Sequence, residues 1–181
     1  MRVGAETFTL QPFGGAARGF AVTAEVGADS AHLLFRWQVT GPSERITMPP
    51  ISAPPTRAHR LWEHTCFEAF FAAPSAEPYT ELNCAPSGDW NLYEFAGYRE
   101  HMREAAVALQ PPRIERTSEH VRATARVPKP PLPTLALNLA VILCFTDHAK
   151  EWFALGHPGR RPDFHDRRSW HTLSLNTPGF C

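Results

Sequence analysis

Apolar residues recur at every second position in several segments of this chain, and this period of two constrains the fold more than any other feature. The segments 20–26, 33–39 and 121–127 each place apolar residues on one side and polar or small residues on the other. In a strand, such alternation buries one face and leaves the other in water. The segment 135–143 is apolar on both faces, which is typical of a central strand. We therefore expect a protein built mainly of β-sheet.

Prolines mark the connections between these strands. The chain has 18 prolines in 181 residues, and they cluster at 42–55 and 128–133. A fixed φ angle and a missing amide donor confine such residues to connections and sheet edges. Neither cluster is long or polar enough to separate two domains, and no internal repeat is visible. Residues 1–181 are therefore expected to form a single domain.

A β-hairpin is predicted where two alternating runs flank a turn sequence. The runs are 79–85 and 89–95, and Pro86-Ser87-Gly88 lies between them. Proline followed by glycine between such runs favours a turn. The segments 152–155 and 170–175 are shorter strand candidates.

Two segments carry a helical spacing. In the segment 97–110 one helical stripe is apolar and Pro111 follows it, which predicts a short helix; the stripe consists of Tyr98, Met102, Ala105 and Leu109. The segment 61–72 fits a helix through Trp62, Cys66 and Phe70, and equally a strand through Cys66, Glu68 and Phe70. About nine short strands with one helix and turns rich in proline and glycine predict an all-β antiparallel sandwich.

Composition and charge exclude several classes of protein. Hydrophobic residues make up 43% and charged residues 20% of the chain, and the formal net charge is +0. This balance gives no long-range attraction to nucleic acid or to an anionic membrane, so neither is an expected partner. The longest apolar stretch, 135–145, is too short to span a membrane. The first residues lack the apolar core of a secretory signal, so we expect a cytoplasmic location.

The four cysteines give no sign of a metal site. Cys66, Cys84, Cys144 and Cys181 form no C-x-x-C pair, which structural zinc sites usually need. In a reducing compartment, free thiols are the expected state.

The densest polar segment is 157–171, with three His, two Asp and four Arg. In extended geometry, Asp163 and His165 project to one side, and His157 could fold back beside them. Such a group could hold a metal or orient a sugar or an acid. The alternative is a solvated loop held by Asp–Arg pairs, which contribute about 0–1 kcal/mol each when exposed.

A second cluster lies at 62–68. If this segment is a strand, Glu68 shares a face with Cys66 and Phe70, where an unpaired carboxylate would be costly. Glu68 then either accepts hydrogen bonds from ligand hydroxyls or pairs with an arginine as a structural bridge. Glu63 would lie on the opposite face, which argues against a shared acid–base site with Glu68.

The third cluster is the predicted hairpin. If Leu82 faces the core, Glu81 and Asn83 face the other way, close to Trp90. Planar polar groups beside an aromatic face suit carbohydrate hydroxyls and C–H bonds. The alternative is that Trp90 lies in the core and that Glu81 and Asn83 are simply exposed to solvent. No G-x-S-x-G motif is present, so nucleophilic catalysis has little support.

Three stretches in register resemble a known family. They are 61–71, 79–91, and 152–155 running to 163–170. They contain a tryptophan before a strand with Glu-x-Phe, a Gly-x-Trp strand, and a late Phe-His-x-Arg segment. Together they resemble the bacterial DOMON-like proteins, which are related to family 9 carbohydrate-binding modules, over roughly residues 15–176.

The resemblance implies a jelly-roll-like β-sandwich that binds a sugar or haem on one sheet or at its rim. It also favours a strand after Trp62 in the segment 61–72. By position, the ligand-face residues would be Trp62, Glu68, Asn83 and Trp90, with His165 and Arg167 or Arg168 added late in the chain. Haem-binding members use a Met and a His as axial ligands. Here Met48 lies in a proline-rich connection and Met102 on the predicted helix, so no such pair is evident.

The first hypothesis is a non-catalytic small-molecule binding domain with carbohydrate as the ligand. The predicted ligand-binding residues are Trp62, Glu63, Glu68, Glu81, Asn83, Trp90, His157, Asp163, His165, Arg167 and Arg168. The alternatives are a hydrolase or isomerase centred on His157, Asp163 and His165, and a haem-binding domain. No cofactor is predicted, although the resemblance leaves haem and Ca²⁺ open. The oligomeric state is not predicted.

Overall fold

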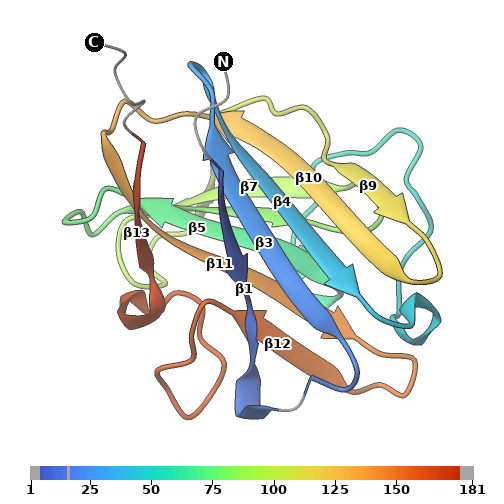
Figure 1. The fold of residues 1–181 in the computed structure, drawn as a ribbon. Helices are drawn as coiled ribbons and strands as arrows, with labels where there is room; N and C mark the ends of the chain where they lie inside the picture. The colour runs from blue at the N-terminus through green and yellow to red at the C-terminus, as the bar shows by residue number, and fades with distance from the viewer. Residues whose placement is uncertain (1–4, 16, 176–181) are drawn as a thin grey trace.

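A computed structural model describes residues 5–15 and 17–175, which form two antiparallel β-sheets packed face to face (Figure 1). The smaller sheet has the order β1 (Glu6–Thr9), β3 (Ala21–Ala28), β4 (His32–Thr40), β10 (His120–Pro128) and β9 (Arg113–Arg116). The larger sheet has the order β2 (Gln11–Pro12), β12 (Lys150–Ala154), β11 (Thr134–Cys144), β5 (Cys66–Ala72), β6 (Tyr79–Cys84), β7 (Trp90–Phe95) and β8 (Arg103–Glu104); β13 (His171–Ser174) also pairs with β11. The predicted all-β sandwich is confirmed.

The period of two produces the core between the sheets. Trp37 and Phe35 point inward from β4 and meet Phe67 and Phe71 from β5. The ring centroids of Trp37 and Phe67 are 6.1 Å apart, and those of Phe35 and Phe71 are 5.8 Å apart. All four side chains are buried. Each aromatic residue buries about 150–250 Å², so these contacts hold the two layers together.

The predicted short helix at 97–110 is wrong, because the described residues contain no α-helix. Arg99 and His101 have φ angles of 56° and 51°, in the left-handed region that no α-helix uses. The edge of β7 binds the chain instead, and the amide of Ala105 donates to the carbonyl of Leu92 at 2.8 Å. Ala105, Val107 and Leu109 pack on the core as an alternating row. Of the predicted helical stripe, only Ala105 and Leu109 pack on this core, whereas Tyr98 and Met102 are 58% and 42% exposed.

The ambiguous segment 61–72 resolves into a short 3₁₀ turn, η3 (Leu61–Glu63), followed by strand β5. The other 3₁₀ turns are η1 (Phe13–Gly15), η2 (Ser43–Arg45) and η4 (Arg167–Ser169). The strands that the sequence did not predict, β1, β2, β8 and β9, have two to four residues each. A period of two cannot be recognised over so few residues.

The predicted hairpin is confirmed as β6 and β7. Gly88 in its turn has a φ of 93°, and a Cβ atom there would lie 3.1 Å from the Pro55 ring. Both facts favour glycine at this position.

Three of the four cysteines lie in the part of the chain that the structure describes. Cys66, Cys84 and Cys144 are free thiols, as expected, and Cys181 lies outside the described residues. Among the described residues, no helix has the length and apolar character to cross a membrane.

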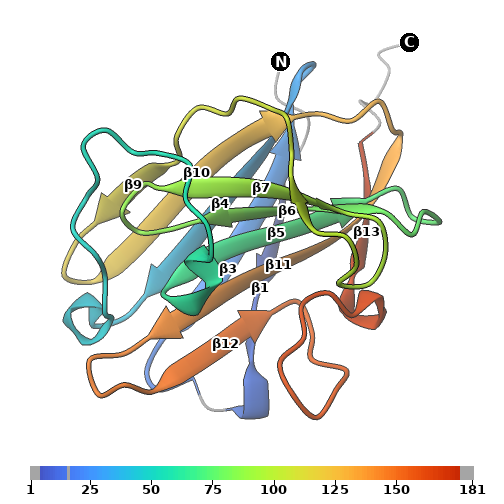
Figure 2. The same ribbon diagram turned by 180° about the vertical axis from the view of Figure 1, so that it is seen from behind.

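The outer face of the larger sheet carries a second apolar cluster. Figure 2 shows this face with loops crossing in front of β5, β6, β7 and β11. Phe70, Tyr79, Phe95 and Ile142 belong to this cluster, and Phe164 packs on them from the segment after β12. A sheet face covered in this way is a floor on which side chains can be buried without entering the main core.

Candidate functional site

A cavity of about 390 Å³ lies over the outer face of the larger sheet. Its size is within the range of about 300–1,000 Å³ that ligand pockets usually have. It is lined by Trp62, Glu68, Glu81, Phe95, Arg99, Met102, Ile142, Trp152, Pro162, Phe164 and His165.

The floor of this cavity is set by strand register. Glu68 of β5 pairs with Asn83 of β6, and Phe70 pairs with Glu81. Residues that pair across antiparallel strands share a face, so Glu68 and Glu81 both point outward. This is the face that the alternation of β5 and β6 predicted for them.

The two carboxyl groups of the floor are buried. Glu68 is 2% exposed and Glu81 is 4% exposed. Burial raises the pKa of Glu81 to about 7, although a hydrogen bond from Asn83 and the charge of Arg99 act in the opposite direction. Burial, and then the charge of Glu81, raise the pKa of Glu68 well above its ordinary value. The low dielectric of an apolar cluster disfavours the charged form of both groups.

Glu81 accepts a hydrogen bond from its neighbour Asn83, whereas one carboxyl oxygen of Glu68 lacks a partner among the described residues. The side-chain amide of Asn83 donates to Oε1 of Glu81 at 2.7 Å, and Cys66 donates to Oδ1 of Asn83 at 3.5 Å. Oε1 of Glu68 has no hydrogen-bond partner among the residues that the structure describes. A buried oxygen without a donor is costly, so the site is complete only when something donates to Glu68.

His165 closes one side of the cavity. The hydroxyl of Tyr79 lies 2.6 Å from Nδ1 of His165 and accepts the backbone amide of Arg99 at 3.2 Å. Burial lowers the pKa of His165 to about 3, so the ring is neutral near pH 7. The Tyr79 proton then goes to Nδ1, which assigns the ring hydrogen to Nε2. Nε2 lies 3.8 Å from Oε2 of Glu81.

Two loops are joined above the floor. Asp163 accepts a hydrogen bond from the guanidinium of Arg99 at 3.0 Å and another from the hydroxyl of Tyr98. Its carboxylate also accepts the backbone amide of His165 at 3.1 Å. These contacts connect the segment after β7 to the segment after β12, so both loops hold their cavity-lining residues in place.

The structure brings together several of the residues predicted from the sequence. Trp62, Glu68, Glu81 and His165 line the cavity. Asn83, fully buried on the same face of β6, donates a hydrogen bond to Glu81. Asp163 lies at the rim through its contacts with Arg99 and Tyr98.

Other predicted residues lie elsewhere. Glu63 is exposed and pairs with Arg60. Trp90 is buried on the opposite face of the sheet, with the Arg57 guanidinium 4.8 Å from its ring centroid. Three more side chains contact groups outside the cavity: Arg167 donates to the carbonyl of Glu77, Arg168 pairs with Asp166, and His157 contacts the carbonyl of Gln11.

The hydrolase or isomerase hypothesis required His157, Asp163 and His165 to converge. Each contacts a different partner: Nε2 of His157 lies 2.8 Å from the carbonyl oxygen of Gln11, and Asp163 and His165 have the contacts given above. In the described part of the chain, no hydrogen bond joins any two of these three side chains, and nothing there favours this hypothesis.

The sequence did not point to Trp152, Arg99, Phe95 or Phe164 as site residues. Trp152 pairs with Ile142 in the β11–β12 ladder, and this register turns its side chain outward. A recognised alternation in β12 could have predicted that face. Arg99 reaches the cavity through a loop with a left-handed φ, in a segment whose apolar spacing predicted a helix instead.

The residues present do not fit haem or calcium. No Met–His pair was evident in the sequence, and in the structure Met102 and His165 line the same cavity. However, Nδ1 of His165 accepts from Tyr79, and Nε2 carries the ring hydrogen and faces Glu81, so neither nitrogen offers a lone pair to an iron. For Ca²⁺, the described residues contain no group of three or more His, Cys, Asp or Glu that could hold a metal ion.

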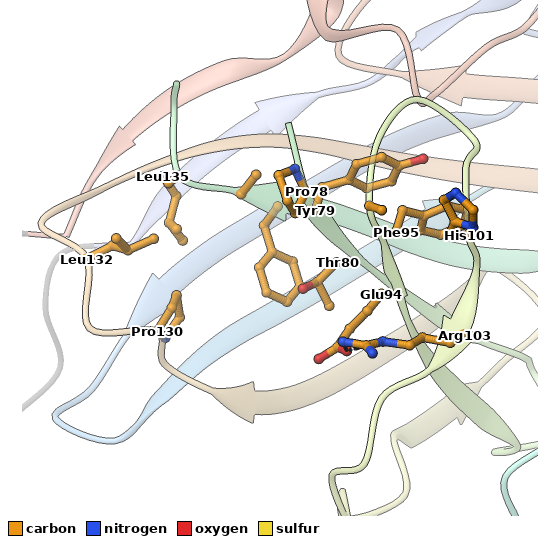
Figure 3. A pocket seen from close by; sticks show the side chains of 14 residues that line it. Pro78, Tyr79, Thr80, Glu94, Phe95, His101, Arg103, Pro130, Leu132 and Leu135 are labelled. Carbon is orange, nitrogen blue, oxygen red and sulfur yellow. Dashed lines mark hydrogen bonds and ion pairs between the residues drawn. The ribbon is translucent and has the colours of Figure 1, made fainter. Parts of the chain in front are cut away.

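A second hollow of about 510 Å³ lies at one end of the sandwich. Figure 3 shows Pro130, Leu132 and Leu135 on one side of it and the Glu94–Arg103 pair on the other. Nε of Arg103 donates to Oε2 of Glu94 at 3.0 Å. The charged groups of this second hollow, Glu94 and Arg103, are thus paired with each other. The floor of the first cavity, in contrast, has a carboxyl oxygen of Glu68 without a partner among the described residues. The first cavity is therefore the candidate site.

Comparison with solved structures shows which known folds this structure resembles. The structure is similar to that of a candidate carbohydrate-binding protein from Bacteroides uniformis, with a TM-score of 0.66 and 17% sequence identity over 95% of this chain and 86% of that one. It is also similar to a family 9 carbohydrate-binding module from Caldicellulosiruptor kristjanssonii in complex with glucose, with a TM-score of 0.61 and 12% identity over 97% and 86% of the two chains.

A second structure of a family 9 module from Caldicellulosiruptor kristjanssonii, in complex with cellotriose, matches with a TM-score of 0.59 and 12% identity, covering 97% of this chain and 84% of that one. No protein-family model matches the sequence, and no curated protein matches it. This chain thus has the two-sheet fold of these carbohydrate-binding modules.

Proposed function

We propose that this protein is a non-catalytic carbohydrate-binding domain of the DOMON-like class, and that the cavity over Glu68 and Glu81 binds the sugar. One observation carries the proposal: two buried carboxyl groups form the floor of a cavity that has aromatic side chains at its sides. The structural neighbours with bound glucose and cellotriose support a sugar as the ligand.

The cavity offers both kinds of contact that a pyranose ring needs. Trp62, Trp152 and Phe95 present apolar surface for the C–H bonds of the sugar. Glu68 and Glu81 accept hydrogen bonds from hydroxyl groups, and the Arg99 guanidinium donates to a ring or hydroxyl oxygen. A hydroxyl that donates to Oε1 of Glu68 supplies the missing partner of that buried oxygen.

Isothermal calorimetry with a panel of monosaccharides and short oligosaccharides tests this proposal. We expect Trp62→Ala and Trp152→Ala each to raise the Kd by about tenfold or more, since burying one large apolar side chain contributes about 1.5–3 kcal/mol. Trp90→Phe is the control, because Trp90 lies on the opposite face. Absence of binding to any sugar, or equal losses in all three variants, would contradict the proposal.

A further inference from the structure

In the described part of the chain, no positively charged side chain forms an ion pair with the carboxyl groups of the cavity floor. Its floor carries the carboxyl groups of Glu68 and Glu81, and Arg99 is the one Lys or Arg side chain among the described lining residues. Arg99 is already bound to Asp163, at 3.0 Å. No ion pair connects Arg99 with either glutamate in the described part of the chain. His165 is neutral near pH 7 because burial lowers its pKa.

Glu68 marks the position in the cavity at which a ligand can donate a hydrogen bond. Its side chain is 2% exposed, lines the cavity, and has an oxygen without a hydrogen-bond partner among the described residues. A buried carboxyl with a free oxygen is satisfied best by a charged donor, because charge-assisted hydrogen bonds are about twice as strong as neutral ones.

The walls of the cavity favour a cation as well. Trp62, Trp152, Phe95 and Phe164 line it, and aromatic faces attract ammonium groups through the ring quadrupole. An acidic floor enclosed by aromatic side chains is the usual chemistry of amine recognition. Burial disfavours the charged form of the floor carboxyls, and a nearby cation would stabilise it. A neutral sugar would use the aromatic walls but would supply no such cation.

We propose that this site selects amino sugars, and that a protonated amino group of the ligand lies against Oε1 of Glu68, with Glu81 as the second carboxyl. This inference rests on the proposed carbohydrate-binding function. It adds the chemical class of the ligand: a sugar in which an ammonium group replaces one hydroxyl.

The test compares ligands that differ in one group. Calorimetry at neutral pH measures the Kd of glucose, of glucosamine and of 6-amino-6-deoxyglucose. We expect at least one of the amino sugars to bind about tenfold or more tightly than glucose, which corresponds to one charge-assisted hydrogen bond. N-acetylglucosamine, which carries no charge, should bind no more tightly than glucose.

Two variants test whether the floor carboxyls, Glu68 and Glu81, cause the preference for amino sugars over glucose. Glu68→Gln keeps the shape of the side chain and removes its ability to ionise against the ammonium group, so the preference for the amino sugar over glucose should fall toward one. Glu81→Gln should lower the same ratio and serves as a second variant if Glu68→Gln does not fold. Glu94→Gln is the matched control, since Glu94 lies in the other hollow, and its ratio should equal that of the wild type.

The outcomes separate this inference from the function on which it rests. Equal affinities for glucose and both amino sugars would overturn the inference and leave carbohydrate binding standing. A preference that survives in both Glu68→Gln and Glu81→Gln would also overturn it. Binding of cyclohexylamine without binding of any sugar would overturn the proposed function, and the amino-sugar assignment with it.

Discussion

The buried carboxyl of Glu81 predicts an unusual pH dependence of stability in the ligand-free protein. Burial raises the pKa of Glu81 from its ordinary value of 4.5 to about 7. The folded protein therefore holds this proton up to about pH 7, whereas the unfolded chain releases it near pH 4.5. Because the folded state binds more protons in this window, the free energy of unfolding falls as the pH rises through it.

The size of the effect follows from the shift. Each pKa unit corresponds to about 1.36 kcal/mol, so the ionisation of Glu81 costs about 3 kcal/mol of stability by about pH 8. His165 acts in the opposite direction: its pKa is lowered to about 3, so its contribution to stability rises between about pH 3 and its ordinary 6.5. The effects of Glu81 and His165 on stability oppose each other below about pH 6.5. A plot of the free energy of unfolding against pH for the wild type alone therefore does not separate them.

The difference between Glu81→Gln and the wild type removes the contribution of His165. It reports the carboxyl of Glu81 together with its coupling to Glu68, whose pKa the charge of Glu81 raises. The substituted amide side chain keeps an oxygen for the Asn83 amide and has no proton to lose. We expect the variant to gain about 3 kcal/mol over the wild type between about pH 4.5 and about pH 8, measured by urea unfolding followed by tryptophan fluorescence. Glu94→Gln, at a half-buried side chain paired with Arg103, is the control and should show a constant difference. A constant difference for Glu81→Gln would refute the reasoning.

Three further predictions concern the supports of the fold and the site. Phe67→Ala should lower the free energy of unfolding by about 3–5 kcal/mol, since it leaves a cavity in the core against Trp37; a loss below about 1 kcal/mol in urea unfolding would contradict this packing. Gly88→Ala should cost at least about 1 kcal/mol, because its φ is positive and the new methyl group meets Pro55; an unchanged Tm would be the contrary result. Asn83→Ala removes the donor that lowers the pKa of Glu81, so the fall in stability should continue to a higher pH than in the wild type, and a profile that levels off at the same pH would count against it.

The sequence predicted those parts of the fold whose signal is local and repeated. Strands were expected where the alternation runs for several residues, and the hairpin at Gly88 was expected from its turn residues. The short edge strands β1, β2, β8 and β9 were missed, because pairing with a neighbour, and not their own pattern, defines them. The prediction for the segment 97–110 was wrong for the same reason, since the free edge of β7 holds it extended.

The candidate site could be predicted only where one strand carries the information. The alternation of β5 and β6 placed Glu68, Glu81 and Asn83 on one face, and the structure has them there. Trp90 belongs to the same hairpin but points to the other face, since it pairs with the inward Cys84. The position of Arg99 at the cavity depends on how a loop closes over the sheet, and no residue spacing in the sequence predicts that closure.

The packing that forms the site also accounts for its chemistry. The larger sheet has an outer apolar cluster, and the loops that carry Phe164 and Arg99 cover it. The resulting enclosure fixes the aromatic walls and, by the same exclusion of water, raises the pKa of both floor carboxyls. A ligand that donates to these groups stabilises their charged form, so binding should release protons near neutral pH. Calorimetry in buffers of different ionisation enthalpy measures that release. Sugar binding without proton release would show that the ligand lies elsewhere than against Glu68 and Glu81.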